Sequence, residues 1–185
     1  MSKVRTALTA ALTALVIAAA AVLWHHLPTP TEVYAPFEVV GSQGEPVAGR
    51  VIALTVTDVR VGPRARARPR PVIAAAGQWV VVDADLEATS TFLMPEAELH
   101  VGENVYIPSD RFALAALGGP LAPGIPQRGS WVFDVAADLL TSNPGTTLQV
   151  WSGDDRFDSR LVVPVSLAGA ERSDPIAVEP VAVGR

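Results

Sequence analysis

Apolar and polar residues alternate through the middle of the chain, with the period of a β-strand that buries one face. Every even position from Val80 to Ala88 is apolar, whereas Asp83, Asp85 and Glu87 lie on the opposite face. The same alternation recurs in three later segments, Trp131–Val135, Leu148–Val150 and Leu161–Leu167. These segments are therefore predicted to be half-buried strands.

Two further patterns concern irregularities and turns. The apolar residues change parity between Val56 and Val59, which predicts a β-bulge near residues 57–58 or a strand that bends from one sheet to the other. Gly102-Glu103-Asn104 separates two short alternating segments at 99–101 and 105–107. This spacing predicts a hairpin.

Residues 36–168 contain seven or eight such strands, separated by Gly- and Pro-rich turns. Their number and spacing predict an all-β fold, an immunoglobulin-like antiparallel β-sandwich. The chain has no cysteine, so it lacks the disulfide of antibody domains. Trp79, Trp131 and Phe133 are expected to supply the bulky packing instead.

The N-terminus carries an unbroken apolar run. Lys3 and Arg5 precede nineteen uncharged residues, Thr6–Trp24, which as a helix measure roughly 28 Å, close to the ~30 Å hydrocarbon core of a bilayer. The next charged residue is Glu32, so cations flank the run on its N-terminal side only. We therefore expect one N-terminal transmembrane helix in the plasma membrane, with a cytoplasmic N-terminus and an extracytoplasmic remainder.

Cleavage of this segment is the alternative. Small residues at 18–21 satisfy the rule of signal peptidase in two overlapping positions, and cleavage would give a secreted protein. Val22, Leu23 and Trp24 continue the apolar run beyond those positions. This continuation favours an uncleaved signal-anchor.

Composition divides the chain into four segments: a signal-anchor helix at 1–26, a Pro-rich spacer at 27–35, the sandwich at 36–168 and a C-terminal tail at 169–185. Pro28 and Pro30 stiffen the spacer because proline fixes φ and restricts the residue before it. The tail has no sustained period of 2 or 3.6. It is predicted to be flexible, with at most one added strand at Ile176–Val178.

The composition excludes several kinds of chemistry. Without cysteine there is no thiolate nucleophile and no Cys-based metal site. Lys3 is the only lysine, so Schiff-base and P-loop lysine chemistry have no residue beyond the extreme N-terminus. Aromatic residues are 6% and the formal net charge is −5, which argues against a nucleic-acid surface. No cofactor is implied.

Three groups of residues carry a resemblance to a known family. They are Gly77-Gln78-Trp79-Val80-Val81-Val82-Asp83, then Leu99–Tyr106 leading to Ser109-Asp110-Arg111, then Pro123-Gly124 with Gly129–Val135. In these the chain resembles immunoglobulin-like domains of unknown function in Gram-positive, actinobacterial cell-envelope proteins, a group related to the mycobacterial immunoprotective extracellular antigen.

The resemblance covers about residues 50–167. It implies an exported sandwich, held by one N-terminal membrane segment or a lipid anchor, without a catalytic site. An Asn often ends the first of those strands in the family, where this chain has Ala88-Thr89. No site residue is carried over from the family.

The sharpest surface feature is the segment 63–71, in which Arg64, Arg66, Arg68 and Arg70 alternate with small residues. Extended backbone would direct the guanidinium groups to one side, as a site for phosphate or carboxylate on a partner protein or an anionic lipid. Without the two cations before the helix, the chain has 12 basic and 19 acidic residues, a formal −7. A protein partner is therefore favoured over lipid. A solvated connection between strands is the competing interpretation.

Acidic residues and histidine are weaker candidates. Asp83, Asp85 and Glu87 share a strand face, and the turn at 154–158 carries three more aspartates, but the turn lacks the order of a calcium loop. His100 would be the only base for a catalytic triad, and no serine lies in a G-x-S-x-G elbow. We assign no catalytic, cofactor-binding or metal-binding residues.

These observations favour a non-enzymatic, membrane-tethered extracytoplasmic interaction module of the bacterial cell envelope, with a membrane or envelope protein as its partner. In one variant it is an accessory subunit of a membrane complex, paired through Ala10, Ala14 and Ala18. The alternative is an envelope ligand-binding protein or hydrolase with an unrecognised carboxylate or His100 site, which requires a pocket with converging polar groups.

The flanking charges predict the topology. A reporter that works only outside the cytoplasm should be active when fused after Pro36, and a cytoplasmic reporter fused at the same point should be inactive. Deleting residues 1–26 should release a soluble protein. Activity of the cytoplasmic reporter would contradict the assigned orientation.

Overall fold

The computed structural model describes residues 2–27, 36–142, 145–154 and 158–184. It separates into two compact units, Met1–Ala35 and Pro36–Arg185. In the first unit, α1 (Ser2–His26) is one continuous helix. Its stretch Arg5–His26 is long and apolar enough to cross a membrane, a property that an N-terminal signal sequence shares. Most of the predicted spacer, residues 28–35, lies outside the described residues.

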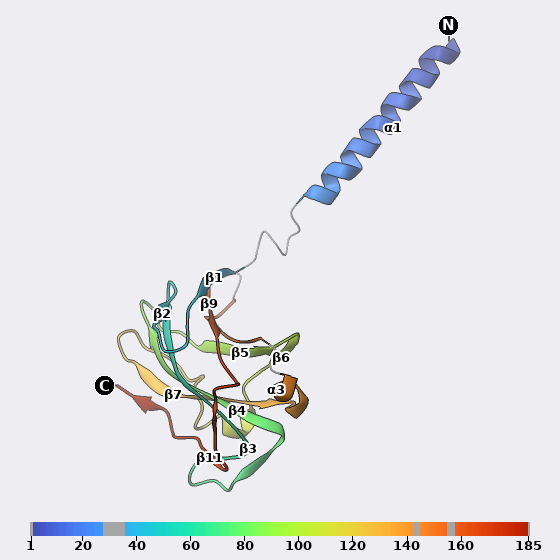
Figure 1. The fold of residues 1–185 in the computed structure, drawn as a ribbon. Helices are drawn as coiled ribbons and strands as arrows, with labels where there is room; N and C mark the ends of the chain where they lie inside the picture. The colour runs from blue at the N-terminus through green and yellow to red at the C-terminus, as the bar shows by residue number, and fades with distance from the viewer. Residues whose placement is uncertain (1, 28–35, 143–144, 155–157, 185) are drawn as a thin grey trace. The chain divides into compact units, whose positions relative to one another are not determined.

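The second unit contains two β-sheets (Figure 1). One sheet has five strands in the order β1-β9-β8-β5-β6. These strands are β1 (Phe37–Val40), β5 (Pro95–Val101), β6 (Asn104–Tyr106), β8 (Thr146–Ser152) and β9 (Ser159–Pro164).

The other sheet has seven strands, of which five follow the order β10-β3-β4-β7-β12, while β2 and β11 also pair with β3. They are β2 (Val47–Ala48), β3 (Ile52–Arg66), β4 (Ile73–Ala88), β7 (Gln127–Val135), β10 (Glu171–Arg172), β11 (Ile176–Ala177) and β12 (Ala182–Val183). Two short helical elements, η1 (Asp110–Phe112) and α3 (Ala137–Ser142), lie between strands.

The main core lies between the two sheets. Leu54, Val82 and Phe133 of the seven-stranded sheet and Leu99 and Leu161 of the five-stranded sheet belong to one cluster of buried residues. All apolar even positions from residue 80 to residue 88 point into this core, as their alternation predicts. The all-β sandwich is thereby confirmed.

The predicted irregularities are also present. The pairing of β3 with β4 shifts register between Val56 and Asp58, which is the predicted bulge. A second shift, between Gly62 and Arg64, has no signal in the hydrophobic pattern. β5 and β6 form the predicted hairpin, with Leu99 opposite Tyr106.

The sandwich is not antiparallel throughout. β1 pairs with β9, and β10 and β11 pair with β3, in parallel register. The physical reason is that segments from the two ends of the domain add to edges already formed by the central antiparallel strands. Such segments arrive through long connections, which place no requirement on strand direction.

The prediction of a flexible C-terminal tail is corrected by the structure, whereas the one added strand that the sequence allowed at Ile176–Val178 is present as β11. Residues 171–177 add to one edge of the seven-stranded sheet as β10 and β11, and β12 pairs with β7 at the other edge. Ile176 and Val178 are almost completely buried. They pack on the outer face of the sheet, in a second buried cluster with Trp79, Val81 and Val132. The tail is therefore held by burial that its own short sequence pattern does not reveal.

Gly62 marks how closely the C-terminal segment, residues 171–183, approaches β3. A Cβ atom at this position would lie 2.1 Å from the Ser173 carbonyl oxygen. The Ser173 N–H donates to the Val61 carbonyl at 3.3 Å, and the Val178 N–H donates to the Arg66 carbonyl at 2.9 Å. Only glycine allows the two backbones to lie at this separation.

Substitution on the two faces of β4 tests the assignment of its inner face. Val82→Asp should lower the free energy of unfolding by several kcal/mol, because it leaves an unpaired charge in the core. Glu87→Gln, on the other face of the same strand, should change it little. Thermal or urea unfolding measures both variants, and equal losses would contradict the assignment.

Gly62→Ala should loosen the C-terminal segment, because the new methyl group cannot fit against the Ser173 carbonyl. We expect faster amide hydrogen exchange in residues 171–178 and a lower melting temperature. Gly119→Ala is the matched control, since nothing lies within 4 Å of its Cβ position. Unchanged exchange in residues 171–178 would show that the close approach of Ser173 does not exclude a side chain at position 62.

Candidate anion-binding site

The end of β3 and the turn after it present the arginines predicted from the sequence. Ala65 and Ala67 are buried in the outer cluster, so Arg64 and Arg66 project from the opposite side of the strand. Beyond β3 the Arg70 N–H donates to the Ala67 carbonyl at 2.8 Å and closes a turn. We call residues 64–70 the arginine turn.

Arg64 is engaged within the domain. Its Nε and Nη2 atoms donate to the two carboxylate oxygens of Asp174, at 2.8 and 3.0 Å. These hydrogen bonds hold the pKa of Asp174 below its usual range. Four residues earlier on β3, Arg60 donates through Nη1 to the Ala177 carbonyl at 2.7 Å. Two arginines of β3 thus bind the C-terminal segment.

Arg66, Arg68 and Arg70 form no ion pair with an acidic residue in the part of the chain that the structure describes. Arg66 is half-buried, and Arg68 and Arg70 are exposed. Arg70 donates through Nη1 to the Arg111 carbonyl at 3.3 Å, which directs it toward η1. Of the four predicted arginines, three therefore remain available for an external anion.

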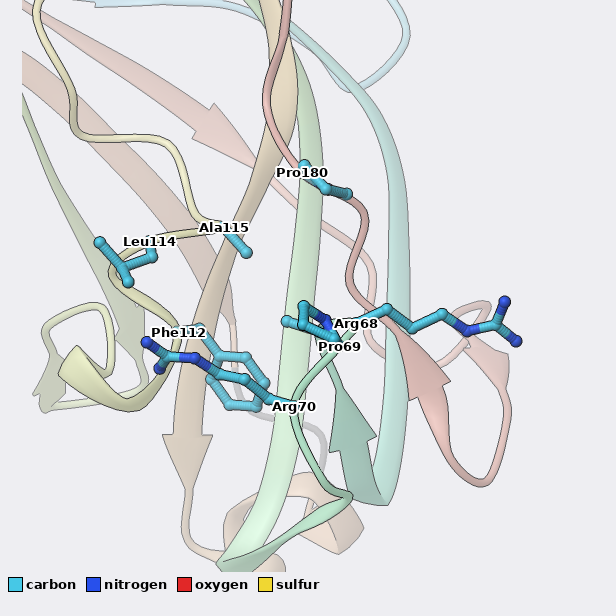
Figure 2. Close-up of a pocket in the computed structure, with 8 residues that line it drawn as sticks. Arg68, Pro69, Arg70, Phe112, Leu114, Ala115 and Pro180 are labelled. Atoms are coloured by element: carbon cyan, nitrogen blue, oxygen red, sulfur yellow. The ribbon is translucent and has the colours of Figure 1, made fainter.

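A small pocket of about 180 Å³ lies beside this turn. Figure 2 shows the Arg70 side chain directed toward Phe112, whereas the Arg68 side chain leads away from the pocket. Arg68, Pro69 and Arg70 line the pocket together with Ala67, Phe112, Leu114, Ala115 and Pro180. The pocket thus has an apolar floor, with the Arg70 guanidinium at its margin.

The floor of the pocket is rigid. Phe112 is 1% exposed and meets Trp79 edge to face, with ring centroids 5.2 Å apart and planes at 84°. Trp79 is fixed in turn, because its Nε1–H donates to the Ile73 carbonyl at 3.0 Å. Leu114 at the pocket margin is 84% exposed. An apolar group bound here would cover a leucine that water now surrounds.

Sequence reasoning missed the residues that complete this site. Phe112, Leu114 and Pro180 lie far from the arginine turn in the chain, and no motif links them to it. Arg111 was also missed, although its guanidinium lies 5.9 Å from the Trp79 ring centroid and its Nη1 donates to the Ala74 carbonyl at 3.2 Å. Only the folded arrangement of β3, η1 and the C-terminal segment brings them together.

Two of the three acidic residues on the outer face of β4 are paired with arginine. Asp83 accepts hydrogen bonds from Arg60 and from the Ser130 hydroxyl, and Asp85 accepts two from Arg128. The hydrogen bonds from Arg128 hold the pKa of Asp85 below its usual range. These carboxylates are therefore already satisfied and do not converge on a shared cation.

The remaining sequence candidates are also dispersed. The His100 Nε2 atom lies 3.0 Å from the Glu98 carboxylate on the same strand. Within the described ranges, no three His, Asp or Glu residues are grouped so that they could hold a metal ion. Residues 155–157 of the aspartate-containing turn lie outside the described residues.

No family model and no curated protein matches this chain, so the resemblance to the antigen-related family gains no support from known families. An uncharacterised β-sandwich protein from Clostridium difficile 630 is similar at 15% identity and a TM-score of 0.46, covering 71% of this chain and 95% of that protein.

A candidate lipoprotein from Bacillus subtilis subsp. subtilis str. 168 is similar at 11% identity and a TM-score of 0.48. The match covers 68% of this chain but only 39% of that protein. Neither likeness assigns a ligand, a partner or an activity to this chain.

Proposed function

We propose that this protein is a non-enzymatic, membrane-tethered extracytoplasmic module that binds an acidic segment of an envelope or membrane protein through its arginine turn. The observation that carries the proposal is the apolar pocket lined in part by Arg68 and Arg70, which, like Arg66 on the same turn, form no ion pair with an acidic residue among the described residues. Helix α1 supplies the tether, with the orientation that its flanking charges favour.

The pocket and the turn fit a particular kind of partner. Guanidinium groups bind carboxylates through paired N–H donors and are less strongly hydrated than ammonium groups. Phe112 and Ala115 offer an apolar surface next to them. The matching ligand is a segment that carries Asp or Glu on either side of one bulky apolar residue.

A protein partner suits the charge of the domain better than lipid does. The chain beyond Arg5 carries a formal −7, which repels an anionic bilayer except where the turn projects beyond it. The titratable residues singled out from the sequence support a binding role over catalysis. Asp83, Asp85 and His100 have partners within the fold and do not line the pocket.

The test uses the full chain in neutral phosphatidylcholine nanodiscs and a fluorescent peptide with a Glu-Leu-Glu core. We expect saturable binding that is lost in the triple variant Arg66→Ala, Arg68→Ala, Arg70→Ala. Single substitutions should be nearly silent, because one exposed ion pair contributes little. Binding should weaken toward physiological salt, where the Debye length is about 8 Å.

Matched controls separate the site from net charge. The triple variant Arg156→Ala, Arg172→Ala, Arg185→Ala removes the same charge outside the arginine turn and should bind as the wild type does. A Glu-Ser-Glu peptide tests the apolar pocket and should bind more weakly. If the two triple variants bind alike, or if binding is insensitive to salt, the arginine turn is a solvated connection. Binding only to anionic vesicles would identify lipid as the ligand instead.

A further inference from the structure

Strand β5 has a gap along one edge. All seven of its residues, Pro95–Val101, pair with β8, but on the other side β6 pairs only with Leu99–Val101 (Figure 1). Just before β5, Leu93 and Leu121 exchange two backbone hydrogen bonds of 2.8 and 3.1 Å. On the side away from β8, residues 95–98 thus form a gap of about 13 Å between two paired stretches. No strand lies beside them on this side among the described residues.

The neighbouring chain passes this gap without closing it. Ile107 and Pro108 border the gap, and proline has no N–H to donate to a strand. Farther on, the Ser109 and Leu117 N–H groups donate to carbonyls of β7, at 2.7 and 2.9 Å. The segment that follows Pro108 is therefore hydrogen-bonded to the seven-stranded sheet. It leaves the edge of β5 open at residues 95–98.

A cleft of about 360 Å³ lies along this open edge. Met94 and Ile107 line it and are 52% and 73% exposed. Leu117 and Trp131, which belong to the main core, line its inner side. The cleft therefore offers apolar contacts at its inner side and margins, beside backbone that lacks a neighbouring strand.

The two faces of β5 differ in chemistry at the gap. Ala97 points into the core, whereas Glu96 and Glu98 lie on the outer face. The Glu98 carboxylate is positioned by His100, 3.0 Å away. A strand added here would direct alternate side chains toward Leu117 and Trp131 and the others beside the two glutamates, where opposite charge stabilises a cross-strand pair.

We propose that the β5 edge binds an extended segment of a partner protein in which apolar residues alternate with Lys or Arg, by adding it to the five-stranded sheet as a further strand. This surface is separate from the arginine turn. It is acidic, whereas the arginine turn is basic. A second copy of this chain is a poor occupant, because its extended basic residues Arg64 and Arg66 already lie in β3 and its net charge is negative.

The test titrates the full chain in neutral detergent micelles with a fluorescent peptide that has a Val-Lys-Val-Lys-Val core. We expect saturable binding, and protection of amide hydrogens in residues 95–98 from exchange. A Val-Glu-Val-Glu-Val peptide should not bind. The double variant Glu96→Lys, Glu98→Lys should reverse this preference and weaken binding of the lysine peptide about tenfold or more.

Two controls separate strand addition from general attraction. A lysine peptide that is N-methylated at every residue of its core keeps its charge but loses the backbone donors of both edges, so it should bind at least about tenfold more weakly. The triple arginine variant described above should bind the lysine peptide as the wild type does, which makes this result independent of the proposed function. Equal binding of the N-methylated peptide, equal binding by the charge-reversed variant, or no saturation up to about 1 mM peptide would each overturn the proposal.

Discussion

Strands β4 and β7 bury side chains on both of their faces, and the rest of the domain is organised around this constraint. Val80 and Val82 point into the main core, whereas Trp79 and Val81 point to the outer face, and all four are completely buried. An antiparallel sheet can leave its outer face to water, but this one cannot without exposing a tryptophan. Residues 112–116 and the C-terminal segment supply the cover. That cover brings Asp174 to Arg64 and Pro180 to the arginine turn.

The charged residues of the seven-stranded sheet reinforce this arrangement. Arg60 and Asp83 join β3 to β4, and Arg128 and Asp85 join β7 to β4. The pair of Arg64 with Asp174 joins β3 to the C-terminal segment. These pairs disfavour a shifted register, because a slip would leave a carboxylate without its donor. Several arginines and acidic residues that lie far apart in the sequence thus form ion pairs in the fold.

The fold could be predicted from the sequence wherever burial followed a local period. The alternation from Val80 to Ala88 defined the inner face of β4, and the change of parity after Val56 marked the bulge. For the tail this pattern indicated only the strand at Ile176–Val178, and neither β10 and β12 nor the burial of the segment. Ile176 and Val178 alternate over only three residues, and the surface that buries them is built by Trp79 and other residues about a hundred positions away.

The arginine turn and its pocket could likewise be predicted only in part from the sequence. The spacing of the arginines predicted an extended segment with its guanidinium groups on one side. Of these four, only Arg64 and Arg66 lie on β3, whereas Arg68 and Arg70 lie in the turn and point in different directions. Nor did the spacing show that Asp174 holds Arg64. The pocket draws on residues 67–70, 112–115 and 180, and no sequence pattern connects three segments at those separations. The gap at β5 was equally hidden, because a missing neighbour depends on where another segment of the chain goes.

The parallel pairing of β1 with β9 has a mechanical consequence. Because β1 is the first strand after the N-terminal segment, any tension in that segment reaches the domain at Phe37. Four residue pairs, from Phe37 with Ser159 to Val40 with Val162, connect β1 to β9, and the Gly41 N–H donates to the Val162 carbonyl at 2.9 Å. A pull along the strand loads all these contacts together, whereas a pull across it opens them one by one. The domain therefore resists force differently in the two directions, and the rate of forced unfolding depends on the direction in which the N-terminal segment is pulled.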